Sequence, residues 1–374
     1  MSARLPRPLH PGAWWLWALG LATAASRTTN PVLLLLVGAV VAYVVAARRT
    51  DAPWARGFRV YVVLGLVVIA VRVAFRMLLD GQHGAHVLFT LPELPLPATA
   101  AGIRIGGPVS LEGVLAAVYD GLRLATLLLC VGAANVLANP KRLLKAMPAA
   151  LHEVGVAVTV ALTVAPQLVE SGQRVRAARR LRGEAGRRFH VFREIALPVM
   201  TDALDRSLLL AAAMDSRGYG RRADVPRRTR IATGSLLVGG LVGICIGTYG
   251  LLDSTAPRHL GLPLLLGGTV VGWLGVVLSG RRVVRSRYRP DPWGAPEWVV
   301  AGVGLLVAAV VIATSAVDPG DLYPSLQPLR WPTLPALPAV AIVLGALPAW
   351  LAPPARLPAV PARSAARQAM ERTA

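Results

Sequence analysis

Stretches of apolar residues long enough to cross a lipid bilayer recur from one end of this sequence to the other. The hydrocarbon core of a bilayer is about 30 Å thick, and a helix crosses it with about 20 apolar residues. The first apolar stretch, 14–25, is shorter than this, which favours a half-helix or an interfacial segment with Trp14, Trp15 and Trp17 as anchors. Only 16% of the 374 residues are charged, so we predict an all-α, polytopic helical membrane protein. The long runs lie near 31–47, 58–79, 111–137, 149–169, 231–252, 260–279, 297–316 and 335–352.

The basic residues lie mostly between and beyond the apolar runs. The chain has 40 Lys and Arg against 19 Asp and Glu, a net charge of +21. Basic loops are retained on the cytoplasmic side of a membrane, beside anionic lipid. Five arginines lie in 281–289 and four in the tail 353–374, whereas the loop 317–334 carries Asp318 and Asp321. We therefore expect the first two segments in the cytoplasm and the loop 317–334 outside.

The topology of the N-terminal half stays open at this point. The loop 48–59 is basic, and so is the region that follows residue 170. Three apolar runs separate them, and three simple crossings would place them on opposite faces of the membrane. Either one run does not cross once, or the loop 48–59 is external.

The central segment 171–230 has a different character from the rest of the chain. It contains 15 Arg, no Lys and six acidic residues. Its apolar residues still recur at helical spacing, as in Val175, Ala178 and Leu181. A basic amphipathic segment of this length cannot lie in hydrocarbon, so we predict long amphipathic helices at the cytoplasmic face.

This change of character divides the sequence into four parts. We expect an N-terminal transmembrane bundle, a cytoplasmic helical segment, additional C-terminal transmembrane helices and a basic, disordered tail. Their boundaries are 1–170, 171–230, 231–352 and 353–374.

Two Arg-Gly pairs mark the central segment, Arg182-Gly183 and Arg217-Gly218. Glycine after a helix supplies the left-handed residue that ends it, and arginine suits the negative end of the helix dipole. One interpretation is two helix ends that share a type of cap. The other is docking into two similar sites of a two-fold partner, because a guanidinium makes several directed hydrogen bonds in one pocket.

These features, in order over residues 25 to 222, resemble the transmembrane T component of energy-coupling factor (ECF) transporters, the family that includes the cobalt-transport subunit CbiQ. The family's helix-ending motif is usually Ala-Arg-Gly, whereas Leu181 and Ser216 precede the arginines here. Besides the two Arg-Gly pairs, the matching features are Thr28-Thr29-Asn30-Pro31, Gly121-Leu122-Arg123-Leu124, the linker Asn139–Pro148, and Pro166 followed by Glu170.

The resemblance implies a scaffold subunit in the cell membrane that is not an enzyme and carries no cofactor. It would bind two ABC-type ATPases through Arg182, Gly183, Arg217 and Gly218, and a small membrane subunit that captures a vitamin or a transition-metal ion. The chain shows no GxxxxGK[ST] motif, so ATP hydrolysis would belong to the partners. The substrate, and whether the scaffold serves one capture subunit or several, stay open.

The alternative is a basic membrane anchor whose 171–230 segment binds anionic lipid or nucleic acid. That alternative explains the charge but not the two Arg-Gly helix ends, so we expect contact with lipid and none with nucleic acid. His83 and His86 form a possible metal pair without a third nearby ligand, and we expect no metal site.

Two further patterns concern the membrane-spanning runs. Arg72 and Asp120 lie inside apolar runs, where charge is costly, so we expect them to form an intramembrane ion pair. Small residues let helices approach closely in lipid, and we expect the glycines that repeat every fourth residue to pack within the chain. These glycines are Gly239, Gly243 and Gly247 in one run, and Gly268 and Gly272 in the next.

Overall fold

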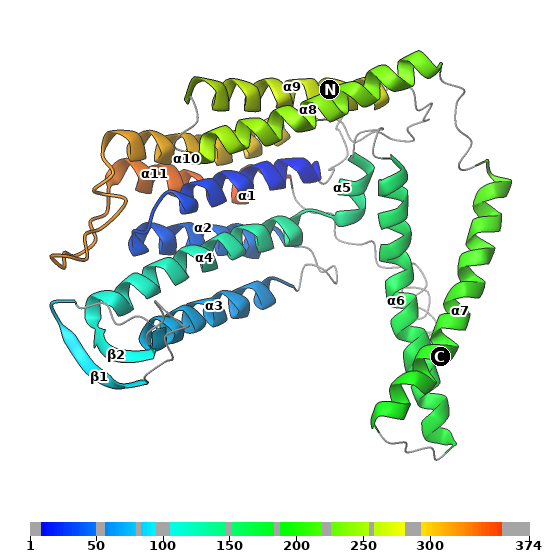
Figure 1. The fold of residues 1–374 in the computed structure, drawn as a ribbon, viewed down its shortest axis with the longest axis horizontal. Coiled ribbons are helices and arrows are strands. Elements are labelled where there is room, and N and C mark those ends of the chain that lie inside the picture. The colour runs from blue at the N-terminus through cyan, green and yellow to red at the C-terminus, as the bar shows by residue number, and fades with distance from the viewer. Residues whose placement is uncertain are drawn as a thin grey trace, which may run out of the picture. The chain divides into compact units, whose positions relative to one another are not determined.

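The protein forms two compact units, drawn in the computed structural model of Figure 1. The first unit consists of Met1–Leu143 and Asp291–Ala374, and the second of Leu144–Pro290. The structure describes residues 9–49, 57–79, 84–94, 105–146, 152–182, 188–218, 226–253, 258–280 and 293–353.

Seven helices in the described part of the chain are long and apolar enough to cross a membrane. They coincide with the predicted long runs, except that the last run forms shorter helices, so the prediction of a polytopic helical membrane protein is confirmed. The first unit contains α1 (Pro11–Ser26), α2 (Pro31–Arg48), α3 (Phe58–Leu79), α4 (Leu111–Leu137), the start of α5 (Pro140–Ala146), α10 (Ala295–Val317), α11 (Ala336–Leu344) and α12 (Pro348–Leu351).

Helix α1 lies at the centre of the first unit, with α10, α4 and α2 around it. Trp17 and Leu21 are fully buried, and Trp14 is 6% exposed. The indole N–H of Trp17 donates a hydrogen bond to the carbonyl oxygen of Gly345 at 3.0 Å. The interfacial interpretation of this segment is therefore wrong, because α1 is enclosed by other helices and its tryptophans pack in the core.

Two helices from opposite ends of the sequence, α1 and α10, pack backbone against backbone. Gly20 of α1 lies directly against Gly304 of α10. Where both helices begin, the buried Glu297 accepts hydrogen bonds from the backbone N–H of His10 at 3.3 Å and of Gly294 at 2.9 Å. The carboxylate thus caps α10 and ties it to the residues before α1.

At the other end of α1, Asn30 joins three segments of the chain. Its side-chain oxygen caps α2 by accepting from the backbone N–H of Val32 at 3.0 Å. Its amide nitrogen donates to the carbonyl oxygens of Asp321 at 3.0 Å and Thr333 at 2.7 Å. Asn30 is fully buried, so its side chain makes these bonds from the interior of the unit.

One end of the first unit is rich in basic residues. Arg48, at the end of α2, donates to the carbonyl oxygen of Ala349 at 2.8 Å, and Arg142 of α5 donates to that of Leu9 at 3.0 Å. These contacts gather the start of α1 and the ends of α2 and α4 at one end, which we call the basic end. Helices α3 and α4 run in opposite directions, so α3 begins there too. Basic residues of this end are Arg48, Arg49, Arg59, Lys141 and Arg142.

A two-stranded antiparallel sheet interrupts the helices between α3 and α4. Strands β1 (Val87–Leu94) and β2 (Ile105–Ser110) pair from Val87 opposite Ser110 to Leu94 opposite Ile105. His86, before β1, lies 2.8 Å from the carboxylate of Glu112 in the first turn of α4. The sequence predicted an all-α fold, and this small sheet is a local departure from it.

The second unit contains two helix pairs: the helices 152–181 and 188–216 form a crossed pair, and the helices 227–252 and 258–280 pack together through glycines. At Gly243, Gly247 and Gly268, an added Cβ would meet the backbone of the opposite helix within 3.0 Å, whereas at Gly239 it would meet nothing within 4 Å. The prediction of packing within the chain is confirmed except at Gly239, which lies on the open side of its helix. The four helices are α6 (His152–Leu181), α7 (Arg188–Ser216), α8 (Arg227–Leu252) and α9 (Arg258–Gly280).

Candidate functional site

Both long helices of the crossed pair end one residue before an arginine. Helix α6 ends at Leu181 and α7 at Ser216. The backbone N–H of Arg182 still bonds to the carbonyl oxygen of Ala178 at 3.2 Å. Gly218 has a φ of 74°, the left-handed conformation that ends a helix without strain at glycine. The predicted helix ends are confirmed, while Gly183 lies outside the described residues.

The side chains of Arg182 and Arg217 are exposed. Among the described residues, neither guanidinium takes part in a hydrogen bond or an ion pair. An arginine at a helix end lies beside unpaired carbonyl groups, and the planar guanidinium keeps five N–H donors for another molecule. The two arginines therefore have the chemistry of anchors for a partner with matching acceptors.

One face of α7 is apolar, and the part of the chain that the structure describes leaves it uncovered. Leu197, Met200, Leu204 and Leu208 are each between 62% and 68% exposed, and they follow one another at spacings of three or four residues. Such spacing places them along one side of the helix. An exposed apolar stripe of this length marks a surface that another protein or lipid covers.

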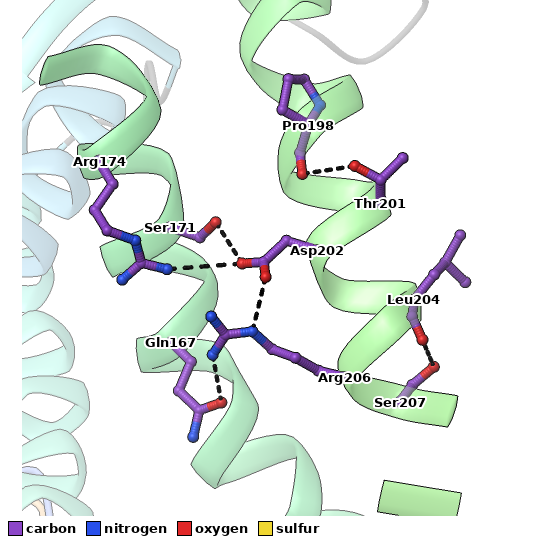
Figure 2. Close-up of polar contacts among 9 residues, drawn as sticks. All are labelled: Gln167, Ser171, Arg174, Pro198, Thr201, Asp202, Leu204, Arg206 and Ser207. Atoms are coloured by element: carbon purple, nitrogen blue, oxygen red, sulfur yellow. Dashed lines mark hydrogen bonds and ion pairs between the residues drawn. The ribbon is translucent and has the colours of Figure 1, made fainter. Parts of the chain in front are cut away.

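The opposite side of α7 faces α6 and carries a polar cluster centred on Asp202 (Figure 2). The carboxylate accepts a hydrogen bond from the hydroxyl of Ser171 on α6 at 2.8 Å. It also accepts one from Nε of Arg206 on its own helix at 3.0 Å, and lies 3.6 Å from the guanidinium of Arg174 on α6. Arg206 in turn donates to the side-chain oxygen of Gln167 on α6 at 3.4 Å. We call these five residues the Asp202 cluster.

The cluster combines a buried hydroxyl with partly exposed charges. Ser171 is 5% exposed, whereas the side chain of Asp202 is 36% exposed. The hydrogen bond from Arg206, followed by that from Ser171, holds the pKa of the Asp202 carboxyl below its usual value, because both stabilise the ionised form. The carboxylate therefore stays charged throughout the neutral pH range.

The sequence interpretation did not identify this cluster. Asp202 and Arg206 are four residues apart in a helical pattern, a spacing at which opposite charges pair on a helix. That signal pointed to a pair on the surface of α7. It could not reveal Ser171 and Arg174, because only the fold brings α6 against α7.

Other predicted site residues lie in the first unit. Arg72 is exposed on α3 and Asp120 is partly buried on α4. In the part of the chain that the structure describes, no ion pair joins them, and their pairing stays a prediction. His83 lies outside the described residues, and His86 bonds to Glu112. No group of three or more potential metal ligands occurs among the described residues.

Comparisons with known proteins agree with this arrangement over most of the chain. The CbiQ family, described as cobalt transport protein, matches residues 2–227. The match includes α1 to α7 and both arginine-ended helices, and stops where α8 begins. A search of curated proteins finds no significant match. The chain belongs to the CbiQ family of cobalt transport proteins and is a multi-pass membrane component of a transporter.

Proposed function

We propose that this protein is the scaffold subunit of an ECF-type ABC importer in the cell membrane. Arg182 and Arg217 anchor two ATPase subunits, one at the end of each crossed helix. A separate small membrane subunit captures the substrate, a vitamin or a transition-metal ion, and the family description favours the metal. The protein itself carries out no chemistry: it transmits movement from the ATPases to the capture subunit.

The observation that carries this proposal is the matched pair of exposed arginines. Each follows the last residue of a helix of about 30 residues, α6 with 30 and α7 with 29. A buried structural arginine would bond to its own protein, but these two make no such bonds with the described residues. A two-fold pair of ATPases offers two equivalent pockets, and each guanidinium fits one pocket.

The charge of the first unit supports an orientation with its basic end in the cytoplasm. Because α3 and α4 run in opposite directions, the start of α3 lies at this same end with the end of α4, as does Arg48 at the end of α2. Helix α10 begins there too, soon after the five arginines of 281–289. The loop 48–59 is then internal, and α6 is the apolar run that does not cross once.

The link between α5 and α6 supports the same conclusion. Five residues separate Ala146 from His152. A chain of that length extends over about 20 Å at most, less than the hydrocarbon core of a bilayer. Helix α6 therefore begins on the cytoplasmic side, and the basic segment that contains Arg182 and Arg217 stays there with the ATPases.

The mechanism that follows is mechanical coupling. ATP binding brings the two ATPases together, and each carries one arginine-ended helix with it. The apolar stripe of Leu197, Met200, Leu204 and Leu208 supplies a non-polar contact surface that neighbouring subunits cover. Movement of α6 and α7 then displaces the capture subunit in the membrane.

The test is retention of the ATPases by the full-length protein purified in mild detergent from its native host. Arg182→Ala combined with Arg217→Ala is expected to weaken binding at least about 30-fold, since each removes a central arginine anchor. The matched control is Arg176→Ala combined with Arg228→Ala. It removes the same charge from exposed positions on α6 and α8.

The control also separates the proposal from the basic-anchor alternative. Binding to lipid or nucleic acid would fall equally in both double variants and would weaken steeply with salt. Equal losses, or ATPases absent from a preparation that keeps other membrane complexes intact, would overturn the proposal. A small hydrophobic protein that co-purifies with the ATPases would identify the substrate.

A further inference from the structure

The Asp202 cluster lies where α6 and α7 cross (Figures 1 and 2). Ser171 contacts Asp202, whereas the earlier residue Gln167 contacts the later residue Arg206. The two helices therefore run in opposite directions through the cluster. Their C-terminal ends, and with them Arg182 and Arg217, extend to opposite sides of it.

One cluster residue on each helix lies at the same spacing from the arginine at the end of that helix. Arg182 is the eleventh residue after Ser171, and Arg217 is the eleventh residue after Arg206. Eleven residues make about three turns of an α-helix and span about 16 Å. Each arginine therefore lies on nearly the same side of its helix as the cluster residue. The cluster thus fixes both the distance and the direction of the anchors.

Each helix also contains a proline on the N-terminal side of the cluster. Pro166 precedes Gln167 in α6, and Pro198 lies four residues before Asp202 in α7. A proline inside a helix removes a backbone hydrogen bond and is a site of bending. The helical segments beyond the two prolines are joined to each other by the cluster. Bending at the prolines would move both anchors together.

Isolated ion pairs on a protein surface contribute little to stability. The Asp202 cluster differs from such a pair in two respects. Its shortest bond across the helices comes from a buried hydroxyl, that of Ser171. In addition, Arg206 bonds to both helices at once, through Asp202 and Gln167. Networks of this kind constrain geometry more than single pairs do.

We propose that Asp202 is the positioning residue of the ATPase docking site: it clamps α6 to α7 so that Arg182 and Arg217 reach both ATPases at once. This inference rests on the proposed function. Two anchors on one rigid body bind together more tightly than either binds alone, because the second contact forms at high effective concentration. Loss of the clamp would weaken that advantage while leaving both arginines in place.

The first measurement is the distance between the two helix ends in the full-length protein, by pulsed electron paramagnetic resonance. Spin labels are placed through Ala178→Cys and Ala213→Cys, each four residues before an anchor and exposed. Cys245 is exposed and is changed to Ser, whereas Cys130 is buried and stays unlabelled. No ATPase is present, so this measurement does not depend on docking.

Loss of the clamp should be visible from either helix. Asp202→Ala and Ser171→Ala are each expected to broaden the distance distribution at least about twofold, since the labels lie about 10 Å along each helix from the cluster and amplify a small change there. The matched controls are Asp205→Ala on α7 and Gln173→Ala on α6, both exposed. A distribution as narrow in the cluster variants as in the controls would overturn the proposal.

The second measurement is the dissociation rate of the ATPase pair from the immobilised protein. Asp202→Ala is expected to raise this rate about tenfold or more relative to Asp205→Ala. A broadened distance with an unchanged dissociation rate would overturn the role in docking. If the ATPases stay bound when both arginines are replaced, the proposed function fails, and the docking role of Asp202 with it. The distance measurement would still report whether the clamp exists.

Discussion

Gly20 of α1 and Gly304 of α10 lie so close together that a side chain on either residue would overlap the backbone of the other helix. Helices in lipid associate through packing and not through a hydrophobic force between them, so small residues at the contact are decisive. This contact joins the family-matched part of the chain to a helix outside the match. Helices α10 to α12 are therefore part of the same packed unit as α1.

Replacement of Gly304 by Ala is expected to destabilise the protein by about 1–3 kcal/mol, because the new methyl group meets the backbone of Trp17. The matched control is Gly302→Ala on the same helix, where nothing lies within 4 Å of an added Cβ. The measurement is the midpoint of thermal unfolding in detergent. Equal midpoints for the two variants would contradict the contact between α1 and α10.

The helix pair α8 and α9 offers a second matched comparison. Gly268 lies against the backbone of Gly240 and Gly243, whereas its neighbour Gly267 faces open space. We expect Gly268→Ala to lower the fraction of protein that remains monodisperse after heating, as judged by size-exclusion chromatography. Gly267→Ala should behave as the unchanged protein does. The reverse order would show that the two helices pack through other faces.

We expect the protein to be destabilised when the hydrogen bonds of Asn30 are removed, and also when its amide donor is replaced by an acceptor. Asn30→Ala removes a helix cap and two bonds from a buried amide to backbone carbonyl groups, a cost of about 2–4 kcal/mol. Asn30→Asp should cost more, since a carboxylate oxygen would then face the carbonyl oxygens of Asp321 and Thr333. The unfolding midpoints of the two variants give the order directly.

A suitable control for Asn30 is Asn135→Ala. Asn135 is exposed on α4 and donates to the hydroxyl of Tyr61 at 3.0 Å, a bond that water can replace. Its unfolding midpoint should differ little from that of the unchanged protein. If Asn30→Asp were as stable as Asn30→Ala, the two bonds to the loop before α11 would not form in the membrane protein.

We expect the clamp at Asp202 to weaken in acid and to be unaffected by pH in the neutral range. Its folded-state pKa lies below the usual value, so its contribution is complete above the usual pKa of Asp, about 4. It is lost as the pH falls through the lower, folded-state pKa. The distance between labels at Ala178 and Ala213 should therefore stay constant from neutral pH to about pH 5 and broaden only in stronger acid.

Asp202→Asn provides the comparison for this pH series. The amide cannot ionise, so any broadening that it shows in acid belongs to other groups and is subtracted. A distribution in the unchanged protein that already broadens well above about pH 5 would contradict a lowered pKa at Asp202.

The helices of this protein could be predicted from the sequence because an apolar run of membrane length has few alternatives. The position of α1 within the bundle could not be predicted in this way. Its residues are apolar on all sides, which shows that it is buried but not by what. The helix that covers it, α10, begins more than 260 residues later in the chain.

The candidate site could also be predicted from the sequence only in part. Arg182 and Arg217 were identifiable because an Arg-Gly pair after an amphipathic run marks a helix end within a few residues of sequence. No local pattern identified Ser171, because its contact with Asp202 exists only in the folded protein, where α7 lies against α6. Contacts between helices depend on their crossing point, which no local pattern records.

The contact between the first and last parts of the chain also sets the order of assembly. His10 and Glu297 are 287 residues apart in sequence, and Trp17 and Gly345 are 328 apart. Helix α1 leaves the ribosome before α10 to α12, which complete its environment. During synthesis α1 can therefore pack at first only against α2 and α4, and the bundle is completed when α10 to α12 have been made. The first unit is thus completed after translation of the second, which folds as an insertion within it.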